Sequence, residues 1–284
     1  MKNRSHLWKG IVAVSVFLIA ACAPANESSS ATASASASCA KADLNTLTPG
    51  KLTIATGQPA YYPWIIDDKP ESGQGFEGAV AYAVANELGF TNEEVSWVRT
   101  TFDSAVTPGA KNFDFNLQQY TITDERKKAV DFSSPYYTTP QAIVSYKGSK
   151  IEGKTTIAEL KNAKLGAGVG TTSLDAISNV IGATPQVFND NAAAVAALKN
   201  GQIDGFVADL PTIFYLAGVE VKDGIIVGQL PLSGTGDDFG LLLSKDNPLT
   251  SCVTKAVDSL RSSGKLAEIT TKWLSTDAGA PVLK

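Results

Sequence analysis

Histidine is nearly missing from this chain of 284 residues, because His6 is the only one. Histidine is the commonest general acid–base group of enzymes and the commonest metal ligand. We expect His6 to be removed with an N-terminal signal, so the mature chain would contain none. This absence argues against catalysis, and the sequence predicts no cofactor and no metal site.

An excess of positive charge is missing too. Residues 1–21 hold three of the 24 basic residues and none of the 28 acidic ones, so the remainder has 21 basic and 28 acidic residues, a net charge of −7. Proteins that bind nucleic acids neutralise phosphates with clustered lysine and arginine. This chain, which has no long basic run, is therefore not expected to bind nucleic acid.

The apolar run at the N-terminus is too short to span a membrane. Residues 11–21 are apolar except for Ser15, and the basic residues Lys2, Arg4 and Lys9 precede them. A short apolar run behind a positive start is typical of a signal peptide. We therefore expect residues 1–21 to be a signal peptide.

This signal ends in Ile19-Ala20-Ala21-Cys22, which resembles the bacterial lipobox. In that motif the cysteine sulfur receives a diacylglycerol, and the cysteine becomes the mature N-terminus, so Cys22 is the candidate lipidation site. Two acyl chains would anchor the protein to the outer face of the cell membrane, on the periplasmic side if two membranes are present. The alternative is an ordinary signal peptide cut near Ala21, with Cys22 a bystander.

Large apolar side chains are scarce in residues 22–42, which consist mainly of alanine and serine. This composition predicts a flexible tether.

Apart from Cys22 the chain has two cysteines, Cys39 and Cys252, and an export compartment permits disulfides. We expect these two to form a bridge that joins the start of the folded region to a C-terminal helix. Two unpaired thiols are the alternative.

Strand and helix patterns alternate along the rest of the chain, which predicts α/β units with mainly parallel sheets. Asn191 is expected to cap an alanine-rich helix, and Pro211 suits the first turn of another. Expected strands cover 51–56, 95–98, 113–119, 164–169 and 203–208, and expected helices begin near residues 76, 171, 191 and 251.

Two of these strands are followed by residues suited to a ligand that carries a carboxylate. Thr121 and Arg126 come after the strand at 113–119, and an arginine fork can grip a carboxylate through two hydrogen bonds. Gly168 to Ser173 forms a glycine-containing turn into a helix, whose free N–H groups suit an anion. The alternatives are a surface arginine and an ordinary strand-to-helix turn. The glycine spacing fits neither a phosphate loop nor a dinucleotide fingerprint.

Asp209 follows the strand at 203–208 and could accept hydrogen bonds from an ammonium group, although a helix N-cap would need no ligand. Tyr61, Tyr62, Trp64 and Phe102 lie in loops after the first and second strands. They could enclose a side chain or could be ordinary core residues. A carboxylate fork, an anion site and one acid together describe a receptor for a zwitterion, and no nucleophile–base pair accompanies them.

Several motifs in order resemble those of the family 3 solute-binding proteins, the polar amino-acid receptors of ABC importers. The most specific is the run from Tyr120 to Tyr137, with the sequence YTITDERKKAVDFSSPYY. The resemblance extends over about 43–276. It also includes Gly75-Phe76-Glu77, Gly170-Thr171-Thr172, the segment 197–205 with Asp209, and the closing Gly264 to Leu274.

The resemblance implies an α/β, two-lobed periplasmic-binding-protein fold of type II, with two mixed α/β lobes joined by two crossing hinge strands. Lobe 1 would comprise 43–137 plus 238–284, and lobe 2 would comprise 140–234. The implied function is to bind a free amino acid by hinge closure and deliver it to an ABC permease in the membrane. We expect a monomer that is not an enzyme.

The resemblance also implies roles for individual residues. Arg126 and Thr121 would bind the ligand α-carboxylate, aided by the backbone at Thr171 and Thr172. Asp209 would bind the α-ammonium group. Tyr61 and Phe102 would flank the ligand side chain, and Trp64, Gln118 and Gln119 complete the expected ligand-binding set.

Departures from the family pattern bear on specificity. Gly57-Gln58 stands where many relatives have an acid, and Gln118, Gln119 and Tyr120 precede Thr121 where relatives have small residues. These amides favour a neutral or polar amino acid, although Asp237 and Asp238 at the second crossover could overturn that inference. Two alternatives stay open: a dehydratase of cyclohexadienyl acids, as among relatives of this fold, and a sensory module without transport.

Overall fold

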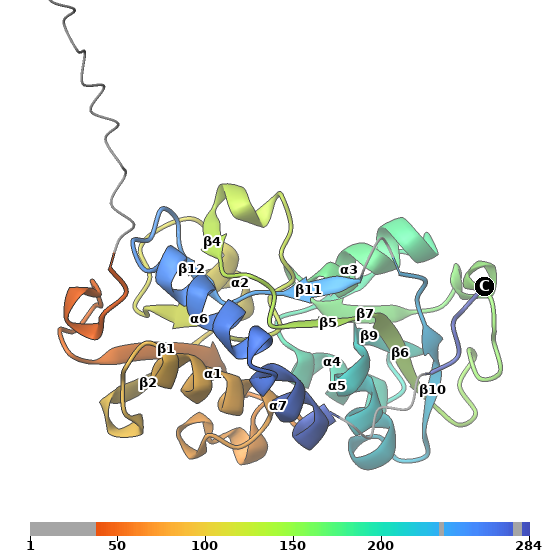
Figure 1. The fold of residues 1–284 in the computed structure, drawn as a ribbon. Coiled ribbons are helices and arrows are strands. Elements are labelled where there is room, and N and C mark those ends of the chain that lie inside the picture. The colour runs from red at the N-terminus through yellow and green to blue at the C-terminus, as the bar shows by residue number, and fades with distance from the viewer. Residues whose placement is uncertain (1–37, 233–235, 275–279) are drawn as a thin grey trace, which may run out of the picture. The chain divides into compact units, whose positions relative to one another are not determined.

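The computed structural model describes residues 38–232, 236–274 and 280–284. The strands of these residues form two five-stranded sheets and a two-stranded ribbon (Figure 1). The expected signal peptide and Cys22 lie outside the described residues, as does most of the tether. No described helix is both long enough and apolar enough to cross a membrane.

The first sheet has the strand order β2-β1-β3-β12-β4. β1 pairs in parallel with β2 and β3, while β12 is antiparallel to both of its neighbours. Nearly every residue of β1 is buried, as expected for a central strand covered on both faces. The strands are β1 (Leu52–Gly57), β2 (Val95–Thr100), β3 (Phe115–Asn116), β4 (Val130–Phe132) and β12 (Leu242–Ser244), and the helices with them are α1 (Phe76–Glu87), α2 (Phe102–Val106), α6 (Thr250–Ser262) and α7 (Lys265–Leu274).

The second sheet has the order β10-β6-β9-β7-β8. β7 is parallel to β8 and β9, whereas β6 is antiparallel to β9 and β10. Its strands are β6 (Gln141–Tyr146), β7 (Leu165–Gly168), β8 (Gln186–Phe188), β9 (Gly205–Asp209) and β10 (Gly224–Gln229), and its helices are α3 (Thr172–Ala176), α4 (Asn191–Lys199) and α5 (Leu210–Tyr215).

The ribbon consists of β5 (Tyr137–Thr139) and β11 (Asp237–Phe239), which pair antiparallel. β5 leads from β4 of the first sheet into β6 of the second, and β11 leads back towards β12. Figure 1 shows both strands between the two groups of elements. They are the two crossing strands that the family resemblance implied.

Three local expectations differ from the structure. The sheets are mixed rather than mainly parallel, because β6 and β12 each follow a crossover and enter their sheets antiparallel. Asp190, not Asn191, caps α4, since its Oδ1 accepts from the Ala193 N–H at 2.8 Å. The helical stretch from 251 divides into α6 and α7 at Gly264, whose φ of +80° ends the first helix.

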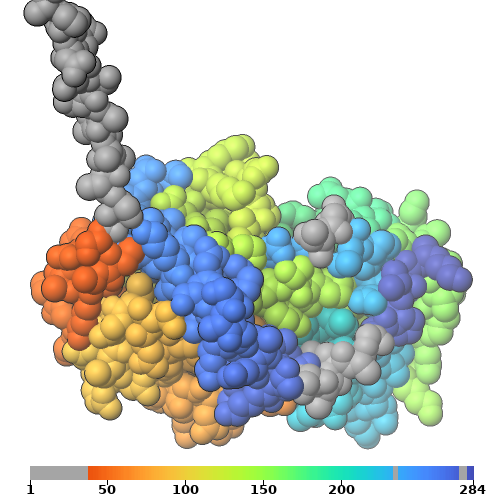
Figure 2. Space-filling model, in the orientation of Figure 1, coloured from red at the N-terminus to blue at the C-terminus, as the bar shows by residue number. Residues whose placement is uncertain are grey.

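The C-terminal residues 280–284 lie against the second sheet, although the expected lobe 1 segment runs to residue 284. Val282 forms a parallel bridge with Gln229 at the end of the edge strand β10. The side chain of Leu283 is 2% exposed and packs in the core of the second sheet. Figure 2 shows this end of the chain, in violet, on the side away from α6. Apolar burial and an unpaired strand edge account for its position.

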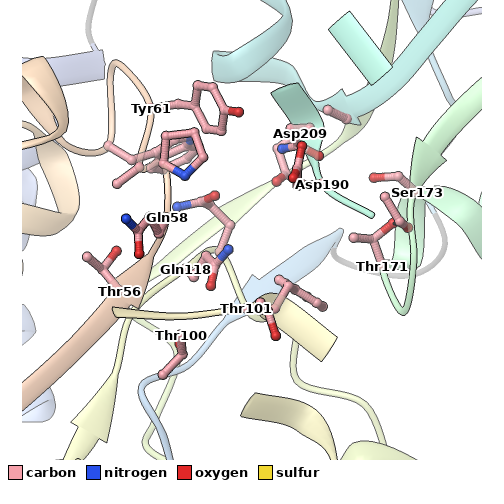
Figure 3. A pocket seen from close by; sticks show the side chains of 18 of the residues that line it. Thr56, Gln58, Tyr61, Thr100, Thr101, Gln118, Thr171, Ser173, Asp190 and Asp209 are labelled. Carbon is pink, nitrogen blue, oxygen red and sulfur yellow. The ribbon is translucent and has the colours of Figure 1, made fainter. Parts of the chain in front are cut away.

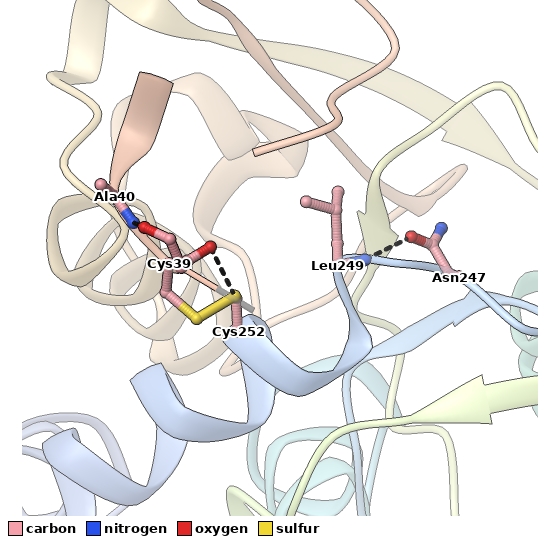
Figure 4. The surroundings of a disulfide bond; sticks show 6 residues. Cys39, Ala40, Asn247, Leu249 and Cys252 are labelled. Carbon is pink, nitrogen blue, oxygen red and sulfur yellow. Dashed lines mark hydrogen bonds between the residues drawn. A yellow bond between two sulfur atoms is a disulfide. The ribbon is translucent and has the colours of Figure 1, made fainter. Parts of the chain in front are cut away.

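The expected disulfide is present. Cys39 and Cys252 are joined across 213 residues with a Cα–Cα distance of 5.4 Å, and Cys252 lies in the first turn of α6 (Figure 4). Cys252 is buried in the core of the first sheet, and Cys39 packs against the same core. The bridge therefore holds the start of the described chain on α6.

Candidate ligand site

Residues from both sheets line a cavity of about 150 Å³ (Figure 3). Much of its wall follows the carboxyl ends of β1, β2, β7, β8 and β9, which is where open α/β sheets bind ligands. The volume suits a small molecule, since a 150 Å³ cavity holds benzene. Of the ten predicted ligand-binding residues, eight line the cavity: Tyr61, Trp64, Phe102, Gln118, Gln119, Thr171, Thr172 and Asp209.

Arg126 and Thr121 are not among the lining residues, but they contact two of them, Phe102 and Thr172 respectively. Arg126 begins a short 3-10 turn, η5 (Arg126–Lys128), and its Nη1 donates to the Thr121 carbonyl at 2.7 Å. Its Nη2 donates to the carbonyl of Gly170, in the second sheet's loop, at 2.9 Å. The guanidinium stacks on the Phe102 ring, with Cζ 5.2 Å from the centroid. Arg126 is therefore half-buried and held in place, not a solvated surface arginine.

Asp209 takes the N-cap position of α5, but its side chain makes no capping bond. Its Oδ1 instead accepts from Gln141 Nε2 at 2.6 Å. Burial, together with the nearby charge of Asp237, raises the pKa of Asp209 to about 8 against the lowering effect of the Gln141 hydrogen bond. The carboxylate is thus free of a helix-capping role and would gain from a positive partner.

Some polar groups of the turn from Gly168 to Ser173 are already hydrogen-bonded within the protein. The Thr171 hydroxyl accepts from the Leu174 N–H at 3.2 Å and donates to the Gly168 carbonyl at 2.7 Å. The N–H groups of Thr172 and Ser173 begin α3 and have no partner within the helix. Thr172 Oγ1 lies 3.3 Å from Thr121 Oγ1, so this turn meets the predicted carboxylate-binding residues.

The aromatic residues divide into three situations. Trp64 is 1% exposed and packs edge-on to Phe76, with centroids 5.8 Å apart, so it is both a core residue and a lining residue. Tyr61 is half-buried in the wall. Tyr62 is exposed, lies outside the lining, and packs on Tyr215 of the second sheet's layer at 4.9 Å.

The side-chain amides of Gln118 and Gln119 are each hydrogen-bonded through only one of their two polar atoms. Gln118 Oε1 accepts from Tyr120 Oη at 3.0 Å. Gln119 donates to Glu77 through its backbone N–H, at 2.8 Å, and through its Nε2. Glu77, 1% exposed, also accepts from Tyr136 Oη, and burial raises its pKa to about 7 against the lowering effect of these bonds.

Several residues of the site were not predicted. From the sequence, Gln58 stood out only as a departure from the family pattern, and Glu77 only as part of the motif Gly75-Phe76-Glu77. The hydroxyls after β1 and β2 could have been found, because a strand's carboxyl end was already the criterion. The other lining residues with polar side chains are Thr56, Thr100, Thr101, Ser173, Asn189, Asp190 and Asn191.

Among the described residues no three of histidine, cysteine, aspartate or glutamate are arranged to hold a metal ion. The chemistry that the site supports is binding, through the acids Asp209, Glu77 and Asp190 and neutral amides or hydroxyls of the wall, with Arg126 as the neighbouring permanent cation. Of the two acids expected at the second crossover, Asp237 contacts Gln141 Nε2 at 2.5 Å. Asp238 accepts from Thr138 at 2.5 Å within the ribbon.

Comparisons with known proteins agree with this architecture. The family model of bacterial extracellular solute-binding proteins, family 3, matches residues 52–276. The L-arginine-binding protein of Pseudomonas aeruginosa is 29% identical over 238 residues, covering 78% of this chain and 86% of that protein. The L-cystine-binding protein TcyJ of Escherichia coli K12 is 30% identical over 229 residues, covering 79% of this chain and 84% of that protein.

A solved structure described as an ancestral arginine-binding protein bound to glutamine aligns with a TM-score of 0.68 at 30% identity. It covers 80% of this chain and 99% of that one. The predicted two-lobed, type II fold is confirmed by this match. The family consists of solute-binding transport proteins rather than enzymes, which confirms the prediction of a binding role. The chain belongs to the bacterial extracellular solute-binding proteins, family 3.

Proposed function

We propose that the protein captures a free amino acid in the cavity between its sheets and delivers it to the permease of an ABC importer. The observation that carries this proposal is the placement of opposite charges. Arg126 belongs to the first sheet's half and Asp209 to the second, and each lies within electrostatic reach of the other. A zwitterion is the ligand that satisfies both.

The carboxylate end would be bound by Arg126. Two of its N–H donors face backbone carbonyls, and a guanidinium has five donors, so others remain for a carboxylate. The Thr121 hydroxyl and the N–H groups at Thr172 and Ser173 would add further donors. The ammonium end would be bound by Asp209, whose ionised form it would stabilise.

Closure follows from this division of contacts. A ligand that touches both halves binds the closed form better than the open form and shifts the population towards it. The ribbon of β5 and β11 would be the hinge, with lobes at 43–137 plus 238–284 and at 140–234. In that scheme residues 280–284 are a part of the lobe 1 segment that contacts lobe 2.

The side-chain end favours a neutral or polar amino acid. Glu77 is already engaged by three donors and is not free for a cationic side chain, and Oδ1 of Asp190, another acid of the wall, caps α4. The side chain of Gln58 makes no hydrogen bond within the described residues, and Gln119 Oε1 is likewise unengaged. Groups that can both donate and accept fit a carboxamide side chain, which makes L-glutamine the first candidate. Asp237 does not line this cavity.

Attachment to the membrane is part of the proposal. A lipid on Cys22 would anchor the protein on the outer face of the cell membrane, and residues 22–42 would tether the binding domain as a monomer. Since Cys39 is tied to Cys252, only the part of this segment before Cys39 would be free to act as a tether.

A thermal-shift screen tests the function. The protein from residue 22, with Cys22→Ser to prevent acylation and Cys39 kept, is screened against the twenty amino acids and L-cystine. A ligand at a hundred times its Kd stabilises the native state by about 2.7 kcal/mol. Stabilisation by L-glutamine or another neutral amino acid supports the proposal. A folded, ligand-free sample that no amino acid stabilises would contradict it.

A further inference from the structure

The side chain of Gln141 connects the predicted ammonium site to the hinge ribbon. It is 7% exposed, and its Nε2 donates to Asp209 Oδ1 at 2.6 Å and to Asp237 Oδ2 at 2.5 Å. Its Oε1 accepts from the hydroxyl of Ser173, which is also 7% exposed. All three polar functions of the amide are therefore engaged, and both carboxylates are held by one NH2 group.

This arrangement fixes the orientation of the amide. Two carboxylates face Nε2, and the Ser173 hydroxyl faces Oε1, so a flipped amide would set its oxygen against two acids. A primary amide is the side chain that can offer two hydrogens to two acids and still accept from a hydroxyl. An apolar residue at position 141 would leave two carboxylates unpaired, and a buried group that loses its hydrogen bond is costly.

The three connected residues lie where both crossovers reach the second sheet. Gln141 begins β6 two residues after β5 ends, and it pairs in register with Asp209 at the end of β9. Asp237 begins β11 and pairs with Thr139 of β5. The distance between Asp237 and Asp209 therefore depends on how the ribbon is set against the second sheet.

We propose that Gln141 is a positioning residue for ammonium recognition, which holds Asp209 towards the cavity and couples it to Asp237 at the hinge. The inference rests on the proposed function, because Asp209 must be the group that meets the ligand's ammonium. Asp237 then acts at a distance: its negative charge disfavours ionisation of Asp209, and the Gln141 amide reduces that penalty.

The charged groups that face Asp209 come from three other elements. Asp237 on β11 and Glu77 on α1 disfavour its ionised form, and Arg126 at η5 favours it. Glu77 and Arg126 are unchanged by substitutions at the hinge. The balance between Gln141 and Asp237 should therefore set the pH at which the site becomes competent.

The test measures how affinity depends on pH. The tightest binder to the unaltered protein among the twenty amino acids and L-cystine serves as probe, and its binding is followed by calorimetry between pH 5.5 and 8.5. Its affinity should rise with pH up to about 8, because ionised Asp209 is the binding form. The variants are Gln141→Leu and Asp237→Asn, and Gln186→Leu, at an exposed glutamine of β8, is the matched control.

Gln141→Leu should weaken binding about 10- to 100-fold at pH 7, the effect of losing a hydrogen bond to a charged group, and should move the midpoint to higher pH. Asp237→Asn should move the midpoint to lower pH and tighten binding at pH 6. A merely structural role would weaken binding equally at every pH.

Unchanged midpoints in both variants would overturn the inference while leaving the proposed function intact. If Gln141→Leu does not fold, Asp237→Asn decides alone: a lowered midpoint supports the coupling and an unchanged one refutes it. An unaltered protein that binds none of the twenty amino acids and does not bind L-cystine would overturn the proposed function and this inference together.

Discussion

Trp64 and Thr212 are joined by a buried hydrogen bond between elements of different sheets. Trp64 Nε1 donates to Thr212 Oγ1 at 2.8 Å across 148 residues of sequence. The two residues are 1% and 4% exposed, respectively. Trp64 lies in the loop after β1. Thr212 lies in α5, the helix that begins directly after Asp209. A contact of this kind is made when the two halves are together and must be lost when they separate.

Replacing Thr212 by valine should therefore weaken closure. The indole N–H would be left buried without an acceptor, at a cost of about 1–3 kcal/mol, so amino-acid affinity should fall by roughly 5- to 150-fold. Calorimetry gives the affinity, and Thr107→Val on the exposed end of α2 is the control. Equal affinities in the two variants would show that this bond does not contribute to closure.

Arg126→Ala should abolish amino-acid binding while leaving the fold intact, because the carboxylate loses its charged partner. Arg126→Lys should recover only part of the affinity, since an ammonium group lacks the planar fork. Asp209→Ala should abolish binding from the other end of the ligand. Lys127→Ala, on an exposed neighbour, is the control. Unaltered affinity in both alanine variants of the site would refute a zwitterion model.

Gly57→Ala should alter ligand preference without damage to the backbone. A Cβ at position 57 would lie 2.5 Å from Gln118 Nε2, so the Gln118 amide would have to move. We expect affinity for a carboxamide side chain to fall by about tenfold, the loss of one neutral hydrogen bond. Gly218→Ala, where a Cβ meets nothing within 4 Å, is the matched control. A specificity profile identical in both would place Gln118 outside the side-chain subsite.

Loss of the disulfide should lower stability but not affinity. Cys39→Ser frees a loop of 213 residues in the unfolded chain, and the expected cost is roughly 2–4 kcal/mol. That corresponds to a melting temperature lower by about 5–15 °C. Reduction of the unaltered protein should give the same shift, and reduction of the variant should give none. Free thiols at Cys39 and Cys252 in the unreduced mature protein, by mass spectrometry, would contradict the pairing.

Stability of the ligand-free protein should decrease as pH rises. The pKa values of Glu77 and Asp209 are raised from 4.5 and 3.8 to about 7 and about 8 in the folded state. Between the unfolded and the folded pKa of each carboxyl group, the folded state binds more protons than the unfolded state. The contribution of the two groups to stability is therefore complete below about pH 4 and is lost by about pH 8. Urea unfolding at pH 5 and pH 8 measures it. Glu77→Gln should flatten the profile between pH 4.5 and 7, and an unchanged slope would show that Glu77 does not carry it.

The order of elements and the family were accessible from sequence because they depend on local information. The periods of apolar residues placed five strands, β1, β2, β3, β7 and β9, and the run from Tyr120 to Tyr137 identified the family. Strand ends located loops that line the cavity, since parallel strands bring their carboxyl ends to one edge. The pairing of Cys39 with Cys252 followed from there being only two cysteines besides Cys22.

Tertiary structure alone decided the contacts between segments far apart in sequence. Gln141 meets Asp209 and Asp237 at separations of 68 and 96 residues, and no local pattern marks such a meeting. The reach of Trp64 to Thr212 and the seating of residues 280–284 on β10 depend likewise on how packed layers face one another. Sequence therefore determined which residue types stand at the strand ends. Packing decided which of them are hydrogen-bonded and which lie at the hinge, because those contacts depend on distances of a few ångströms that only the folded chain establishes.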